Sequence, residues 1–180
     1  MIKKTIKFGL SESEIDRAIK EIDEYKKYIE SKTELLKKRI AEFIADKAGA
    51  GFSGAIVNDL LPGSGGPRYA NVNVAIKEDG GVFIVIANGE DAVWVEFGAG
   101  VYHNGPPGST PNPLGEQLGF RIGEYGLGYG KGETWYFEDR TTGETKFTHG
   151  TPANMPMYKA LEAVVHDLKS IVREVFKEND

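Results

Sequence analysis

The sequence predicts an α+β domain in which a long N-terminal helix and a C-terminal amphipathic helix pack on a mainly antiparallel sheet. Three observations carry this prediction. Apolar residues recur every seven positions between residues 15 and 43, short alternating segments separated by turn residues follow, and an apolar stripe of helical spacing ends the chain. A helix, then several strands, then a helix is an order typical of the α+β class.

Composition limits the classes of function. The 180 residues suffice for one domain with a substantial core, so we expect a single domain over residues 1–180. The absence of cysteine excludes disulfides, thiolate catalysis and cysteine-ligated zinc, and suits a reducing cytoplasm. A net charge of −5 argues against direct nucleic-acid recognition. No apolar run approaches the roughly 18–20 residues of a membrane span, so we expect no membrane contact.

The N-terminal part predicts an edge strand over residues 1–10 and a long helix over residues 11–48. Ser11 and Glu14 have the spacing of a capping box, and Leu10 and Ile15 that of a hydrophobic staple. At about 1.5 Å per residue the helix is on the order of 50 Å long, more than the domain needs. Interspersed charges favour a solvated outer face, and contact with a partner helix is the alternative. The stripe consists of Ile15, Ile22, Ile29, Leu36 and Phe43, flanked by Ile19, Tyr25, Ile40 and Ile44.

Alternating and apolar segments predict the sheet over residues 69–97 and 133–148. Residues 72–76 alternate, residues 82–86 are continuously apolar and are expected to form a central strand, and residues 92–97 are expected to form another strand. A hairpin is predicted from residues 134–138 and 145–147, which flank a turn.

Residues 98–132 predict a long loop rich in glycine, proline and aromatic residues, holding eleven of the 23 glycines. A segment of this length without regular structure is uncommon unless it is functional or disordered. We expect it to be mobile in the free chain and to order against a neighbouring subunit, which hydrogen exchange in the free chain and in the assembled particle would test. The expected contact residues are Tyr102, His103, Phe120, Tyr125 and Tyr129.

The last helix is predicted over residues 153–177, with Thr151 and Asn154 as candidate caps. If its stripe is buried, replacing Leu168 with alanine should cost about 2–5 kcal/mol. The stripe consists of Leu161, Val164, Val165, Leu168, Ile171, Val172, Val175 and Phe176.

Catalytic and ligand-binding patterns are weak. His103, His149 and His166 lack the short spacing of a metal site. A Ser109, His149 and Glu96 trio can be drawn, but Ser109 lacks the strand-turn-helix context of a nucleophile elbow. The glycine-rich runs at residues 62–67 and 126–132 fail the phosphate-loop templates. We therefore predict no catalytic, cofactor-binding or metal-binding residues.

Two motifs carry a resemblance to a known family. They are Val95-Glu96-Phe97-Gly98-Ala99-Gly100 and His149-Gly150-Thr151-Pro152-Ala153-Asn154-Met155-Pro156-Met157-Tyr158-Lys159-Ala160, with an aromatic strand start at Trp135 between them. In order and spacing they resemble the tail-component family of long-tailed bacteriophages named for gene product ten of phage Hong Kong 97. The chain departs from the family at Ala99, where the family commonly has threonine, at residues 154–157, where it commonly has Arg-Pro-Phe-Met, and in a longer loop. The matching residues are Glu96, Phe97, Gly98, Gly100, Trp135, His149, Gly150, Pro152, Ala153, Pro156 and Met157.

The resemblance implies a structural protein of the virion, not an enzyme, that acts in tail completion or head-tail joining. It implies a ring of identical subunits, with the head connector and the tail tube as neighbours, no cofactor, and synthesis in the cytoplasm of the bacterial host. In such a ring one patch meets a different patch on the next copy. The alternatives are a minor capsid or other neck protein and, in another class, a small enzyme or ligand-binding domain with residues 98–132 as a lid over Glu96, His103 and His149.

Overall fold

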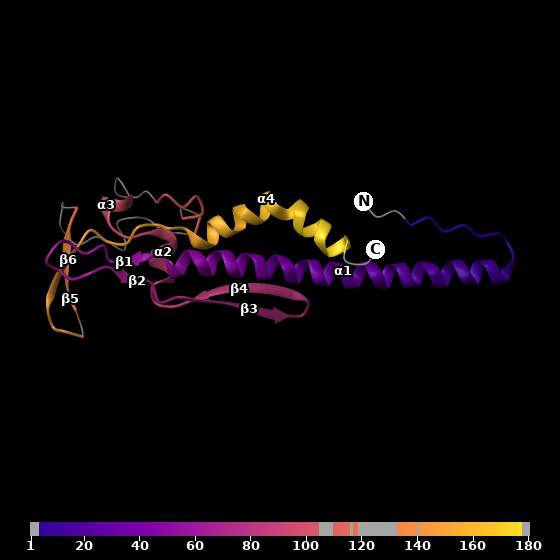
Figure 1. Ribbon diagram of the computed structural model, residues 1–180, viewed down its shortest axis with the longest axis horizontal. Coiled ribbons are helices and arrows are strands. Elements are labelled where there is room, and N and C mark those ends of the chain that lie inside the picture. Colours follow the sequence, from indigo (N-terminus) through magenta and orange to yellow (C-terminus); the bar gives the residue numbers. More distant parts are fainter. Residues whose placement is uncertain (1–3, 105–109, 116, 119–132, 140, 178–180) are drawn as a thin grey trace.

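The architecture is built along one helix. In the computed structural model, helix α1 (Glu12–Ser53) spans most of the length of the molecule (Figure 1). Helix α4 (Pro156–Lys177) lies along α1, and a β-hairpin lies along the opposite side of α1 in the same view. The predicted α+β class is confirmed. The structure describes residues 4–104, 110–115, 117–118, 133–139 and 141–177.

Helix α1 confirms the long predicted helix and extends it to Ser53. Its N-cap residue is Ser11, whose carbonyl accepts from the amides of Glu14 and Ile15 at 3.1 and 3.0 Å. The Ser11 hydroxyl donates to the Glu14 carboxylate at 2.6 Å and makes no bond to a backbone amide, so the predicted capping box is wrong in its details. The predicted staple is also wrong, because Leu10 is 93% exposed.

The first part of α1 projects beyond its partners. Lys32 donates to the carbonyl of Val175, near the end of α4, at 2.7 Å. Lys37 donates to the carbonyl of Gly81, at the tip of the hairpin, at 3.2 Å. Residues 12–31, which we call the arm, extend past both contacts over roughly 30 Å (Figure 1).

Residues 4–9 have no regular secondary structure, so the edge strand predicted over residues 1–10 is wrong for the part that the structure describes. They run back beside the arm, where the Lys4 ammonium lies 5.9 Å from the centre of the Tyr25 ring (Figure 1). A strand needs a neighbouring strand to bond its backbone, and this segment lies against a helix instead.

The hairpin consists of β3 (Asn73–Asp79) and β4 (Val82–Asn88), paired antiparallel from Asn73 opposite Asn88 to Asp79 opposite Val82. Val74 and Ala87 pack against the core. The predicted central position of residues 82–86 is wrong, because β4 pairs with β3 alone among the described residues. Val82 and Ile84 are 59% and 42% exposed, since they lie on the face opposite Val74 and Ala87.

Residues 92–97 form helix α2 (Ala92–Phe97), so the strand predicted there is wrong. The buried residues Ala92, Val95 and Glu96 follow the i, i+3, i+4 spacing of one helix face. Gly98 ends the helix with φ 76°, and its amide donates to the carbonyl of Trp94 at 2.7 Å. This backbone conformation favours glycine, which explains the residue in the first motif.

The remaining strands are short. β1 (Ile56–Val57) pairs antiparallel with β2 (Arg68–Tyr69). β5 (Trp135–Glu138) pairs antiparallel with β6 (Thr145–Thr148), which confirms the hairpin predicted from residues 134–138 and 145–147. The strands of the described residues form three two-stranded sheets, so the single sheet predicted from residues 69–97 and 133–148 is wrong.

The predicted loop over residues 98–132 contains the short helix α3 (Val101–Asn104), so it is not wholly irregular. Its other parts at residues 105–109, 116 and 119–132 lie outside the described residues, and the expected mobility of the loop stays a prediction.

The core lies at the C-terminal end of α1. Phe52 is 1% exposed, and Val95 of α2 and Ala160 of α4 join it. One cluster therefore ties α1, α2, α4 and the β1 region together, and it positions the motifs described below. Its buried members are Ala48, Phe52, Ala55, Val57, Ala92, Val95 and Ala160.

Helix α4 begins three residues later than predicted, at Pro156, and packs mainly on α1, so the predicted packing on a sheet is wrong. Ile171 and Val175 are buried against α1. Leu161, Val165 and Leu168 are 46%, 78% and 41% exposed, so the predicted stripe is buried on one side and bare on the other.

The partial exposure of Leu168 lowers the cost expected for Leu168→Ala from 2–5 to about 1 kcal/mol in the isolated chain, because less apolar area leaves water on folding. Ile171→Ala, at 8% exposure, should cost about 2–4 kcal/mol. Urea unfolding of both variants at one protein concentration measures the difference. Equal losses would mean that the two sides of α4 are equally covered in solution.

Candidate functional site

The two motifs that carry the family resemblance meet in space. The Ala99 amide donates to the Thr151 carbonyl at 2.8 Å, and the Thr151 amide returns a bond to Ala99 at 2.9 Å. The amide of Asn154 donates to the carbonyl of Val95 at 2.8 Å. Segments more than 50 positions apart in the chain therefore form one backbone junction, which we call the motif junction.

Glu96 joins the motif junction to α4 through its side chain. Glu96 is 8% exposed, and its carboxylate accepts from the amides of Met157 and Tyr158 at 2.8 and 3.0 Å. These amides belong to the second and third residues of α4, which an N-cap side chain normally satisfies. Met155, at the N-cap position, has no side-chain oxygen that could accept from these amides. The Glu96 side chain therefore acts as the cap from a distant segment. Its negative charge also suits the N-terminus of a helix.

Sequence reasoning gave the cap to Thr151 or Asn154, and neither fills it. The Thr151 hydroxyl accepts from the Asn58 amide at 3.2 Å, and the Asn154 side chain donates to the Pro152 carbonyl at 3.2 Å. Both side chains hold the chain that leads into α4.

Asn112 is a second buried polar residue that sequence reasoning missed. It is 2% exposed, and its side-chain nitrogen donates to the Glu96 carboxylate at 2.9 Å. Its side-chain oxygen accepts from the Leu114 amide at 2.9 Å, and Thr110 donates to the Phe97 carbonyl at 2.9 Å. Residues 110–114 thus fold back onto the end of α2. In the sequence Asn112 is flanked by two prolines, a pattern that indicates a turn. The pattern does not indicate which distant residue the asparagine side chain contacts.

Asp59 brings His103 and His149 together. One Asp59 carboxylate oxygen lies 3.2 Å from Nε2 of His103 and 3.9 Å from Nδ1 of His149. The backbone holds this arrangement, because the Asp59 amide donates to Gly150 at 2.6 Å and the His149 amide donates to Asp59 at 2.9 Å. Asp59 lies in a connector without periodicity, so no sequence signal identified it.

Tyr102 completes what we call the His-Asp-His cluster, made of Asp59, Tyr102, His103 and His149. The rings of Tyr102 and His149 stack with centroids 4.0 Å apart, and the Tyr102 and His103 rings meet edge to face at 5.0 Å. Nε2 of His103 is buried and makes no hydrogen bond of good geometry, although Asp59 lies close to it.

Burial lowers the pKa of His103 below its ordinary value of 6.5, the Asp59 carboxylate opposes this shift, and His149 adds to it. Because the unfolded chain then binds the proton more tightly, the free energy of unfolding should rise with pH through the region around 6.5. We expect His103→Gln to flatten that rise, as measured by urea unfolding from about pH 5 to 7.5. His166→Gln is the control, since His166 pairs with Asp167 on the surface of α4. An unchanged slope in His103→Gln would contradict the assignment.

The site residues predicted from the sequence divide into four groups. Tyr102, His103 and His149 come together in the cluster, whereas the Glu96 carboxylate is engaged by α4, so the trio with His149 is not assembled as drawn. Trp135 lies in β5. Phe120, Tyr125, Tyr129 and Ser109 lie outside the described residues. The motif junction and its flanks contain Glu96, Phe97, Gly98, Gly100, His149, Gly150, Pro152, Ala153, Pro156 and Met157.

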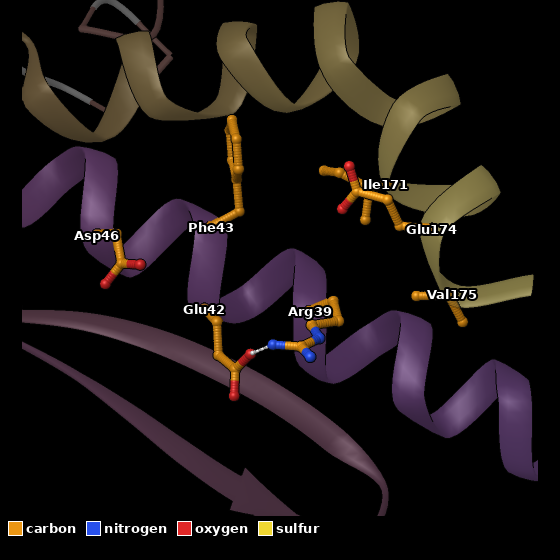
Figure 2. Close-up of a pocket in the computed structure, with 7 residues that line it drawn as sticks. All are labelled: Arg39, Glu42, Phe43, Asp46, Ile171, Glu174 and Val175. Atoms are coloured by element: carbon orange, nitrogen blue, oxygen red, sulfur yellow. Dashed lines mark hydrogen bonds and ion pairs between the residues drawn. The ribbon is translucent and has the colours of Figure 1, made fainter. Parts of the chain in front are cut away.

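A pocket of ≈ 330 Å³ lies elsewhere, between α1 and α4 (Figure 2). Arg39 and Glu42 form an ion pair at 3.2 Å on its α1 side. Its wall mixes apolar and charged side chains and includes none of the cluster residues. Its lining residues are Arg39, Glu42, Phe43, Asp46, Ile171, Glu174 and Val175. Within the described ranges, no group of three or more His, Asp or Glu side chains is arranged to hold a metal ion.

Large apolar side chains are exposed at many positions, and three groups of them lie on the arm, on the outer side of α4 and on the outer face of the β3–β4 hairpin. Large contiguous apolar patches on protein surfaces mark interaction sites, so these rows are the candidate contact surfaces of the described residues. The exposed residues of these three groups are Ile15, Ile19 and Ile22 on the arm, Leu161, Val165 and Leu168 on α4, and Val82 and Ile84 on the β3–β4 hairpin.

In the part of the chain that the structure describes, no helix is both long and apolar enough to cross a membrane. Comparisons of the chain with known protein families, with curated proteins and with solved structures find no match.

Proposed function

We propose that the chain is a structural subunit of a long-tailed phage or prophage particle that acts in tail completion or head-tail joining by forming a ring. The observation that carries the proposal is the arm. A helix that projects roughly 30 Å from its domain and leaves Ile15, Ile19 and Ile22 exposed to solvent suits a subunit that contacts its neighbours.

The motif junction supports the choice of family. The residues that resemble the tail-component family lie far apart in the chain, yet they bond to each other and cap α4 through Glu96. A shared motif pair is more informative when both halves belong to one structural unit. The proposed location is the virion, after synthesis in the host cytoplasm, and the proposed neighbours are the head connector and the tail tube.

The His-Asp-His cluster favours a second candidate, a small enzyme or ligand-binding domain with residues 98–132 as its lid. The cluster places two imidazoles around one carboxylate. Imidazole and carboxylate side chains are common general acids and bases in enzymes. The double variant His103→Gln, His149→Gln separates the two candidates, because a virion subunit that still folds should support assembly without either imidazole.

Deletion of the gene from the phage that encodes it, followed by electron microscopy of the induced lysate, tests the proposal. We expect filled heads beside unattached tails, or tails of abnormal length. Defective heads would instead favour the minor capsid role. Intact infectious particles would overturn the structural role and favour the lid-and-cluster candidate.

A further inference from the structure

We propose that the arm of one copy docks antiparallel onto the outer side of α4 in a second copy. The inference rests on the ring assembly proposed above and specifies the surfaces that make it. Both surfaces are partly exposed in the isolated chain, and each carries three exposed apolar side chains on one helix.

The two rows have the same spacing. On the arm, Ile15, Ile19 and Ile22 are 39%, 53% and 53% exposed and follow i, i+4, i+7. On α4, Leu161, Val165 and Leu168 follow the same spacing. Rows of this kind place their side chains along one line of a helix, so each row can insert between the side chains of the other.

The occupant must come from another molecule. The arm belongs to the same helix against which its own α4 packs, and it points away beyond the last turn of that α4, where Lys32 bonds to Val175. A helix cannot fold back on itself to reach the outer side of α4, whereas the arm of a second copy can approach that side freely.

Charge at the edges of the rows decides the orientation. The exposed carboxylates of Glu12 and Asp16 border the arm row near its start. The exposed side chains of Lys169 and Arg173 border the α4 row near its end. When two helices pack antiparallel, corresponding flanks meet, so pairing Ile19 with Val165 places Asp16 near Lys169 and Glu12 near Arg173.

The other end of the contact is mixed in charge. Glu162 faces the stretch of the arm that carries Lys20, Asp23 and Lys27. Glu162 therefore meets two opposite charges, from the lysines, and one like charge, from Asp23. In a parallel arrangement opposite flanks meet, so the acidic border of the arm would not face the basic border of α4 and the pairs Asp16–Lys169 and Glu12–Arg173 would not form. The antiparallel arrangement is therefore the one that charge favours.

One such contact is small. Six apolar side chains over about two helical turns bury less than the roughly 1,200 Å² of a stable interface. Each chain, however, carries both surfaces and can make two contacts, one through its arm and one through its α4. Such a head-to-tail contact closes a ring when the rotation permits, and a reciprocal pair of copies is the other closed form.

Disulfide trapping tests the contact directly, because the natural chain has no cysteine. The single variants Ile19→Cys and Val165→Cys, one of them carrying an affinity tag, are purified, mixed and mildly oxidised. We expect the mixed disulfide dimer to exceed either homodimer and to exceed about fivefold the yield from Arg17→Cys with Val165→Cys. Arg17 is exposed and lies across the helix from Ile19, so it is the matched control.

Charge exchange provides a second readout that a fold defect cannot imitate. Lys169→Glu with Arg173→Glu should lower the trapped yield about tenfold, and pairing that chain with one carrying Glu12→Lys and Asp16→Lys should restore it. Circular dichroism confirms that each variant retains its helices.

The outcomes separate the contact from the assembly. A mixed dimer no more abundant than the Arg17 control overturns the contact, whatever the mass of the particles by light scattering. If large particles form without the crosslink, the ring role stands and the docking surfaces are wrong. In a chain that carries both Ile19→Cys and Val165→Cys, crosslinked products that stop at the dimer support the reciprocal pair and argue against the ring.

Discussion

Replacing Phe52 with alanine is expected to lower the free energy of unfolding by about 3–5 kcal/mol. Phe52 is 1% exposed and lies in the cluster that joins α1 to Val95 of α2 and Ala160 of α4. Truncation removes a ring from a site whose walls come from several elements, so the surroundings cannot collapse fully into the space. Urea unfolding at a fixed protein concentration, with the slope m compared between variants, measures the loss.

Two controls define what the Phe52 result means. Phe52→Leu keeps much of the volume and should cost less than about 1.5 kcal/mol. Phe8→Ala removes the same ring from a position that is 57% exposed and should change stability by less than about 0.5 kcal/mol. A loss below 1 kcal/mol for Phe52→Ala would mean that the core is centred elsewhere.

Replacing Glu96 with alanine is expected to cost about 2–4 kcal/mol, because three donors lose a buried acceptor at once. The amides of Met157 and Tyr158 and the side chain of Asn112 all bond to this carboxylate. The loss should concentrate at the start of α4, so hydrogen exchange of the Met157 and Tyr158 amides should accelerate more than that of the amides near Ile171. Denaturant unfolding measures the total, and exchange measured by NMR locates it.

Glu96→Gln separates the charge from the shape. The amide keeps one oxygen acceptor but turns a donor toward one of the backbone amides, so we expect roughly half of the alanine loss. Glu90→Ala is the matched control, since Glu90 is exposed just before α2. Equal effects at Glu90 and Glu96 would show that the cap contributes nothing.

The helices could be predicted from the sequence better than the strands. A seven-residue repeat with Ser11 before it and a stripe after Pro156 are local signals, and both helices are present. The valines and aromatic residues of residues 92–97 predict a strand, in which every second side chain lies on the same face. The buried residues Ala92, Val95 and Glu96 instead follow the spacing of a helix. Continuous hydrophobicity in β4 was read as burial on both faces, although Val82 and Ile84 are exposed in the single chain.

The candidate site could be predicted only in part. The motifs named Glu96 and His149, but the partners of these residues depend on the tertiary fold. Asp59 and Asn112 lie in segments without periodicity, and nothing local indicates that one faces two histidines and the other faces Glu96. The resemblance singled out two segments that bond to each other in the structure, and it could not give their contacts.

The two ends of α4 are held by distant side chains of opposite charge. Glu96 binds the amides at its N-terminus, and Lys32, which is 6% exposed, binds a carbonyl near its C-terminus. Each charge interacts favourably with the partial charge of the helix macrodipole at its end of α4. Neither end can fray without breaking a hydrogen bond to another element. We expect α4 to open as one cooperative unit rather than turn by turn. A surface on such a helix is preorganised, so a partner that binds its outer side orders little that was not ordered before.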